Sequence, residues 1–261
     1  YHGALAQRIG EEGRGVAAII RMVQHTRLDC VIGSAQQMRG ALAQAVWHAA
    51  HRTAFQKRLI DQPMMAAVLT DLAVESEAAT ALSLRLAQAF DQEDPLTRLA
   101  TPIAKYWVCK RAPGMVYEAM ESLGGAGYVE TGPMPRLFRQ SPLNAIWEGS
   151  GNVIALDVLR AFGREPESVA GLRSFLEARR GPDAVYDAWI ADLDLTEASE
   201  ANARWTVERL ALALQAAVLL EGESPIAHLF CRLRLQPQGR FYGAVDGAID
   251  TRRVLDRAVP R

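Results

Sequence analysis

Apolar residues recur at helical spacing through most of this chain, and no segment alternates apolar and polar residues over any length. The helical runs cover about residues 15–58, 63–90, 95–123 and 151–162. Asp94-Pro95 is a typical helix start, and Gly124-Gly125 is a typical helix stop. Four helices with three connections predict an all-α fold built on an antiparallel four-helix bundle, with no strands after the first few residues.

The second part of the chain has a different pattern. Residues 125–150 carry several glycines and prolines, and they are expected to be mostly loop. After Gly163, the stretch "GREPES" looks like a linker. Further helical patterns follow near 167–180, 183–194, 197–221, 225–235 and 241–258. The sequence therefore predicts a bundle over 15–163 and an additional, smaller helical unit over 164–261.

Composition excludes several classes of function. Lys and Arg total 29 and Asp and Glu total 30, so nothing global points to nucleic acid or to an anionic membrane. No stretch approaches the roughly 20 apolar residues that a membrane span needs. The three cysteines lie far apart without CxxC or zinc spacing, which predicts a reduced, cytoplasmic protein. His48 and His51 have no third ligand nearby in the sequence, so no metal site is expected.

A lone carboxylate, Glu148, stands before the last bundle helix in "LNAIWEGSGNVIALDVLR". A structural explanation is available, because the helix dipole favours an acidic group near an N-terminus by up to about 1 kcal/mol. A catalytic base is the other interpretation, since Ile146, Trp147 and an apolar substrate would remove water from the charged carboxylate. Gly149 would let a ligand approach the backbone, and free amides at the helix start would bind an oxygen. The residues alone leave both interpretations open.

Two motifs in this region resemble the C-terminal signature of acyl-CoA dehydrogenases. The first is the [QE]-x-x-G-G-x-G-[YF] turn, here "ESLGGAGY" at 121–128. The second is the [YW]-E-G-[ST] segment, here "WEGS" at 147–150. "HRTAFQKRLIDQP" resembles the family's R-x-x-F-[GQ]-x-x-[LI] segment. The resemblance covers roughly residues 8–162 and, with the extra helical unit, is closest in wording to the AidB, or alkylation-response, branch.

The resemblance implies a chemistry: FAD-dependent oxidation of the Cα–Cβ bond of an acyl-CoA thioester. Glu148 would take the α proton as the base, and its backbone amide would help to hold the thioester oxygen. Gly149 would line the acyl site, and Arg27 would face the CoA side of the cavity. In a second subgroup of the family the base comes from the long first helix. That position here is Thr26, which cannot act as a base, so Glu148 is the candidate.

The FAD contacts implied by the resemblance fall into two sets. Arg52 and Phe55 match a segment that touches the pyrophosphate and adenine side of FAD in a neighbouring subunit. Glu121, Gly124 and Gly125 match the turn that receives the adenine dinucleotide from that neighbour, with glutamate where many members have glutamine.

A second set of implied contacts lies nearer to the flavin. Ser150 and Asn152 match the residues after the base that contact FAD, where many members have Thr and Gln. Gln62, beside Pro63, stands near a position where some members have a flavin-binding glutamine.

The resemblance also predicts the surroundings of the chain. FAD would lie at a subunit interface of a homotetramer in the bacterial cytoplasm, and an electron acceptor such as an electron-transfer flavoprotein would reoxidise it. Residues 1–14 would be the end of an upstream β domain or linker, so that this chain alone would be an inactive part of a longer enzyme.

The alternative function is that of an AidB-like alkylation-defence flavoprotein, which binds DNA or destroys alkylating agents with little dehydrogenase turnover. Residues 164–261 hold 13 arginines, no lysine and 15 acidic residues. A surface that binds phosphates normally has a basic excess, so this composition argues against DNA binding by the additional unit.

Overall fold

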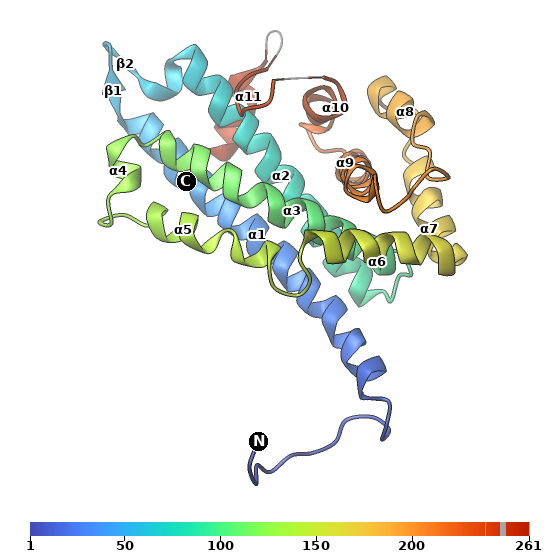
Figure 1. Cartoon of the computed structure of the whole chain (residues 1–261). Helices are drawn as coiled ribbons and strands as arrows, with labels where there is room; N and C mark the ends of the chain where they lie inside the picture. Colours follow the sequence, from blue (N-terminus) through green and yellow to red (C-terminus); the bar gives the residue numbers. More distant parts are fainter. Residues whose placement is uncertain (238, 246–248, 261) are drawn as a thin grey trace.

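The computed structural model describes residues 1–237, 239–245 and 249–260, and helices dominate these ranges (Figure 1). The expected all-α fold is confirmed. The longest bundle helices are α1 (Gly15–His51), α2 (Pro63–Asp91) and α3 (Thr97–Glu121), which pack against one another, and α6 (Gly151–Arg164) packs against α3. No helix in the described ranges is both long and apolar enough to cross a membrane.

The core of the bundle is filled by small and branched apolar side chains. The fully buried ones on α1, α2 and α3 include Val31, Met38, Leu42, Leu69, Leu82, Leu99, Ile103 and Met115. Removing such a side chain from water contributes about 1.5–3 kcal/mol. At the start of α2, Pro63 takes the first helical position, where its missing N–H would have no helical partner. After α3, Gly124 adopts a φ of +59°, which glycine reaches without a steric penalty.

The connection over 125–150 corrects the prediction of a mostly irregular loop. It contains α4 (Gly125–Tyr128), α5 (Met134–Gln140) and the 3-10 turn η2 (Leu143–Ala145). These helices are too short to give a recognisable apolar period in the sequence.

A small hairpin is a second correction, because α1 ends at His51 rather than near residue 58. Strands β1 (Thr53–Ala54) and β2 (Lys57–Arg58) pair in antiparallel register, and η1 (Leu59–Asp61) leads into α2. Phe55 and Gln56 form the turn between them with φ values of +51° and +65°. Two positive φ values match the twist of a two-residue hairpin turn. The expectation of no strands was wrong here because strands of two residues cannot show alternation.

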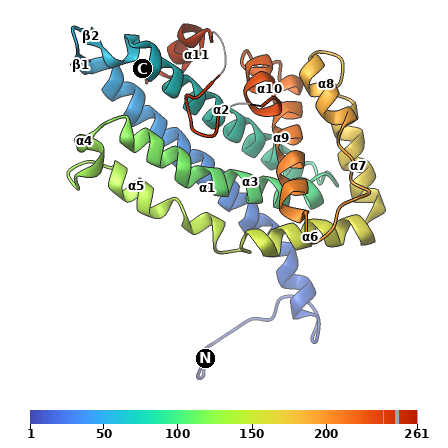
Figure 2. The ribbon, with the colours of Figure 1, turned by 45° about the horizontal axis from the view of Figure 1, so that its top comes forward.

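The additional unit is a set of five helices on the α2 side of the bundle (Figure 2). They are α7 (Pro166–Glu177), α8 (Ala184–Ala191), α9 (Ala203–Glu221), α10 (Ala227–Leu235) and α11 (Thr251–Ala258). Helix α9 packs against α2 and α3, and α11 packs against α2. The helix predicted over 241–258 is too long, because 241–245 is irregular and 246–248 lies outside the described residues. The division of the chain into three units stays a prediction.

A buried ion cluster joins this unit to the bundle. Glu75 on α2 accepts hydrogen bonds from Arg111 on α3 at 3.1 and 2.9 Å and from Arg234 on α10 at 2.9 Å. Arg234 also pairs with Asp71 at 2.6 Å. Burial alone would raise the pKa of Glu75, but the two guanidinium groups more than offset this and hold its pKa at about 2.

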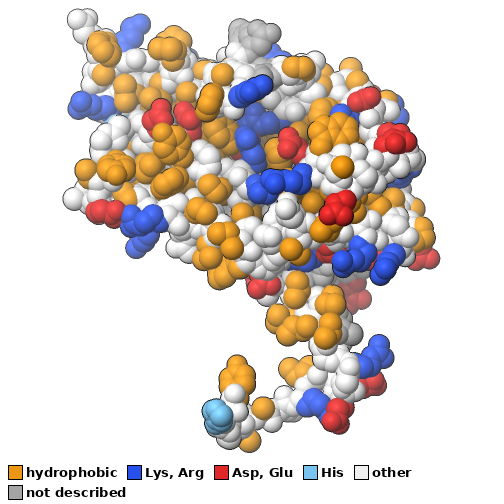
Figure 3. Space-filling model, in the orientation of Figure 1, with side chains coloured by type: hydrophobic (Ala, Val, Ile, Leu, Met, Phe, Trp, Pro, Cys, Tyr) orange, Lys and Arg blue, Asp and Glu red, His pale blue; other side chains and the backbone are white. Residues whose placement is uncertain are grey.

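The start of α1 projects from the rest of the molecule (Figure 1). Val16, Ile19, Ile20 and Met22 on these first turns are exposed. Figure 3 shows apolar side chains on this projecting segment, clear of the main body. The described part of the chain therefore leaves an apolar segment uncovered.

Candidate active site

A cavity of about 670 Å³ lies between α1 and the segment that runs from α5 to Glu148. One face of α1 forms its first wall, through Thr26, Asp29, Cys30, Gly33, Gln36, Gln37 and Gly40. The second wall consists of Leu137, Gln140, Asn144, Trp147 and Glu148. A cavity of this size and mixed polarity is typical of a small-molecule site.

The second wall is held against α1 by hydrogen bonds. The Asn144 side chain is buried, and its Nδ2 donates to Ser34 Oγ on α1 at 3.1 Å. Its Oδ1 accepts from Trp147 Nε1 at 3.0 Å. Ile146 and Trp147 are both exposed, so neither side chain shields the neighbouring carboxylate in this chain. The apolar cover expected for Glu148 therefore has to come from a ligand or from another segment.

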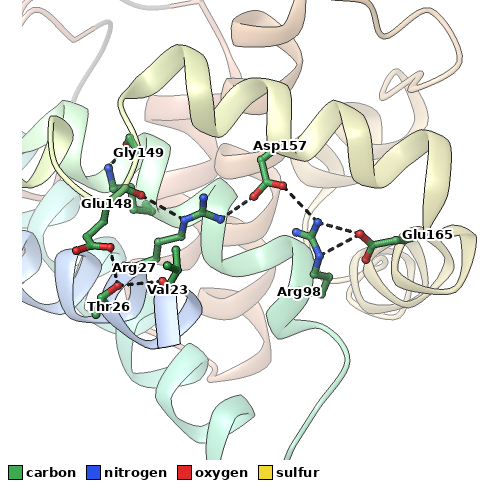
Figure 4. A network of polar contacts seen from close by, with 9 residues as sticks. Val23, Thr26, Arg27, Arg98, Glu148, Gly149, Asp157 and Glu165 are labelled. Carbon is green, nitrogen blue, oxygen red and sulfur yellow. Dashed lines mark hydrogen bonds and ion pairs between the residues drawn. The ribbon is translucent and has the colours of Figure 1, made fainter. Parts of the chain in front are cut away.

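The carboxylate of Glu148 points towards Thr26 on α1 (Figure 4). Thr26 Oγ1 lies 2.8 Å from Glu148 Oε2 and 3.1 Å from the Val23 carbonyl oxygen. The hydroxyl has a single hydrogen, so it donates to one of these oxygens at a time. Among the described residues, no Lys, Arg or His lies within ion-pair distance of Glu148. The carboxylate thus keeps lone pairs that face the cavity and are free to accept a proton.

The backbone at Glu148 forms a sharp, left-handed elbow. The φ angles are +56° at Glu148 and +105° at Gly149. A Cβ at Gly149 would lie 3.0 Å from Ile154 Cδ1, a tight contact, and the positive φ there is one that glycine adopts without strain. Arg27 Nε donates to the Glu148 carbonyl at 3.3 Å, and Lys105 Nζ donates to the carbonyl of Trp147 at 2.9 Å and to that of Gly149.

Lys105 is the site residue that sequence reasoning missed. The signal was a single lysine inside the apolar stretch "TPIAKYWVC" of α3. A charged residue in such a stretch is seldom buried without a specific partner.

Arg27 does not line the cavity. It is buried and donates to Asp157 on α6 at 2.6 Å, as Figure 4 shows. Asp157 also lies 3.4 Å from Arg98, which binds Glu165 at 2.9 Å. This chain of ion pairs fixes α6 against α1 and α3. A contact between Arg27 and substrate stays a prediction.

Two buried cysteines lie beside the elbow. Cys30 lines the cavity, and Cys109 Sγ donates to the Cys30 carbonyl at 3.4 Å. Burial raises the pKa of both thiols, to about 12 for Cys109. Both are therefore neutral at physiological pH and are weak nucleophiles.

Three residues predicted to contact FAD lie around the β1–β2 hairpin. Arg52 is exposed, with no ion pair among the described residues. Phe55 at the tip of the hairpin is 92% exposed. Gln62 is different, because its Nε2 donates to the Ala54 carbonyl at 3.0 Å and so closes the hairpin.

The remaining predicted FAD residues separate into two places. Glu121, Gly124 and Gly125 are exposed at the end of α3 and the start of α4, at the hairpin end of the bundle (Figure 2). Ser150 and Asn152 are exposed at the start of α6, next to Glu148. The Ser150 side chain makes no capping hydrogen bond with α6.

Several known proteins are similar to this chain in sequence. Residues 13–163 match the family model for the acyl-CoA dehydrogenase C-terminal domain. AidB of Escherichia coli (strain K12) is 38% identical over 247 residues, which are 92% of this chain and 46% of that protein. Acyl-CoA dehydrogenase family member 11 of Caenorhabditis elegans is 38% identical over 173 residues, 62% of this chain and 28% of the relative. The chain thus spans less than half of either relative.

A solved structure adds a likeness of fold. ACDH-11 of Caenorhabditis elegans in complex with C11-CoA matches 96% of this chain and 49% of its own length, with a TM-score of 0.71 at 24% identity. At that identity the match shows the fold alone.

Proposed function

Because this chain belongs to the acyl-CoA dehydrogenase family, we propose that it supplies the catalytic base for oxidation of an acyl-CoA thioester between Cα and Cβ. Glu148 takes the proton from Cα. The electron pair of that C–H bond forms the Cα=Cβ double bond while a hydride leaves Cβ. The acyl group occupies the cavity along α1, with Thr26 and Gly149 near the reacting carbons.

One observation carries this proposal: the Glu148 carboxylate borders a large cavity, and among the described residues no cation lies within ion-pair distance of it. A carboxylate held by an arginine would be a poor base, because the cation stabilises its charged form. Here a single hydroxyl, from Thr26, orients one oxygen and leaves the other free. A purely structural carboxylate at the start of α6 would need no cavity beside it.

A bound acyl chain would complete the environment of the base. Ile146 and Trp147 are exposed in this chain, so an apolar ligand between them and α1 would displace water from Glu148. The charged carboxylate would then be poorly hydrated, and it would lie next to the α hydrogen that the thioester makes more acidic. Both conditions favour proton transfer.

FAD is the cofactor of this family, and when bound it accepts the hydride from Cβ. The residues present fit such a dinucleotide. Exposed Phe55 offers an aromatic face, and the Arg52 guanidinium is suited to the pyrophosphate. The Ser150 hydroxyl and the Asn152 amide are open to the flavin end. Gln62 fits less well because its amide is already bonded within the hairpin.

The positions of these residues favour a cofactor site shared by two copies of the chain. Thr26, next to the base, and Arg52 are 26 residues apart on or beside α1. At 1.5 Å per residue this is about 39 Å. A cofactor beside Glu148 would therefore contact Ser150 of the same copy and Arg52 of a second copy. A homotetramer with FAD at its interfaces satisfies this geometry, with an electron-transfer flavoprotein as the electron acceptor.

We further infer that the chain works as the C-terminal part of a longer flavoprotein. Its coverage of 46% of the Escherichia coli relative supports this. The exposed apolar residues Val16, Ile19 and Ile20 offer a surface for an additional packed segment. On its own the 261-residue chain is expected to bind FAD weakly and to show no turnover.

The test uses the complete flavoprotein, in which this chain follows the upstream segment that its relatives carry. Addition of a series of straight and branched acyl-CoA thioesters should bleach the flavin absorbance, and Glu148→Gln should abolish bleaching while FAD stays bound. Glu177→Gln, on the exposed face of α7, is the matched control and should bleach like the wild type. Retained colour with no bleaching by any acyl-CoA would favour the alkylation-defence alternative. Bleaching by Glu148→Gln at the wild-type rate would refute the proposal.

A further inference from the structure

Three consecutive backbone carbonyls at the elbow are each bound by a buried cation. Lys105 Nζ lies 2.9 Å from the Trp147 oxygen and also donates to the Gly149 oxygen. Arg27 Nε donates to the oxygen between them, that of Glu148. The carbonyls thus point into the bundle.

The elbow needs such support because its backbone is strained. Glu148 has a φ of +56°, and a non-glycine residue in the left-handed region persists only where the surrounding structure holds it there. The next residue, Gly149, also has a positive φ. Without the cationic donors, Glu148 would relax to the more common negative φ, and its side chain would leave the cavity.

The Lys105 ammonium is an unusual group to find at this place. The side chain is 1% exposed, on α3 among apolar neighbours. Burial lowers its pKa, and the nearby Arg27 lowers it further, while the carboxylate of Glu148 acts in the opposite direction. Among the described residues no carboxylate lies within ion-pair distance of its Nζ. A buried charge without an ion-pair partner is destabilising, so a purely structural position would favour an apolar residue of similar volume.

We propose that Lys105 is a positioning residue for Glu148. Its buried ammonium holds the carbonyls on either side of Glu148 and so keeps the left-handed backbone that aims the carboxylate at the cavity. This proposal rests on the proposed function of Glu148 as the base. Arg27 holds the third carbonyl, but it also fixes α6 through Asp157, so Lys105 is the residue whose contacts are confined to the elbow.

The test is Lys105→Met in the complete flavoprotein, since methionine fills the volume without donating. The rate of exchange of the acyl-CoA α hydrogen in D2O should fall about 100-fold, the typical loss when a reacting group moves by about 1 Å. The acyl-CoA Kd and the FAD content should stay within about threefold of the wild type, because neither depends on the angle of the carboxylate. Arg180→Met removes one exposed cation just after the end of α7, and this variant should exchange the α hydrogen at the wild-type rate.

A rate close to wild type in Lys105→Met would overturn the proposal. So would equal losses of rate, acyl-CoA affinity and FAD content, because they would show a general structural role. If Lys105→Met does not fold, Lys105→Gln is the second variant. Its shorter amide reaches one carbonyl and should give an intermediate exchange rate. If neither variant folds, the lysine acts on the whole fold and the proposal is wrong. Glu148→Gln distinguishes failure of the Lys105 proposal from failure of the proposed function. If exchange persists in Glu148→Gln, the proposed function itself is refuted.

Discussion

Replacing Glu75 by glutamine tests how firmly the additional helical unit is bound to the bundle. Glu75 receives three hydrogen bonds of 2.9–3.1 Å from Arg111 and Arg234 and is fully buried between α2, α3 and α10. Glutamine keeps the shape but removes the charge, so two largely buried guanidinium groups lose their common partner. Breaking a buried ion pair from one side costs about 3–5 kcal/mol.

The pKa of Glu75 gives a second route to the magnitude of this loss of stability. The pKa falls from an ordinary 4.5 to about 2 in the folded protein. At 1.36 kcal/mol per pKa unit, this corresponds to about 3 kcal/mol of stability. Because the folded pKa is the lower one, the contribution is complete above pH 4.5 and is lost as the pH falls towards 2. The wild-type advantage should therefore be largest at neutral pH and should shrink through this acidic window.

The assay is urea unfolding of the 261-residue chain, followed by far-ultraviolet circular dichroism at several pH values. Glu75→Gln should lower the free energy of unfolding by about 3 kcal/mol at pH 7. The control is Glu177→Gln, which breaks an exposed pair with Arg180 and should change the free energy by less than about 1 kcal/mol. Equal small effects of both variants, or a Glu75→Gln effect that does not decrease below pH 4.5, would refute the reasoning.

Two further predictions concern an exposed and a buried side chain. Phe55→Ala should reduce FAD retention by the complete flavoprotein, measured after gel filtration, yet change the free energy of unfolding by less than about 0.5 kcal/mol, because Phe55 is 92% exposed. Unchanged FAD retention would remove Phe55 from the cofactor site. Cys109, with its pKa raised to about 12, should react with an aromatic disulfide reagent at pH 8 only as fast as the chain unfolds. Rapid labelling of Cys109 in the folded chain would contradict the described burial.

The helices were predictable where the apolar period was long. Helices α2, α3 and α6 begin and end within a few residues of the predicted bounds, because proline, aspartate and glycine mark their ends in the sequence. The hairpin around Phe55 and the short helix α5 were not predictable, since neither is long enough to show a period. The exposed start of α1 shows another limit: apolar spacing identifies a packing face but not what covers it.

The site was predictable only as a set of candidates. Glu148 stands out in the sequence because the glycines after it and the helix beyond it form a recognisable motif. Its contact with Thr26 joins residues 122 positions apart, and such a distant pairing depends on how α1 and the loop pack. Lys105 had no motif, and its role depends on backbone carbonyls that carry no sequence signal.

Loss of the Cα hydrogen to solvent is the most direct test of the central claim. The complete flavoprotein would be incubated with acyl-CoA in D2O under anaerobic conditions, and deuterium at Cα would be measured by mass spectrometry. A positioned general base contributes about 10²–10⁴-fold to such a transfer, so Glu148→Gln should slow exchange by that factor while acyl-CoA still binds. Exchange at the wild-type rate in Glu148→Gln would show that another group removes the proton.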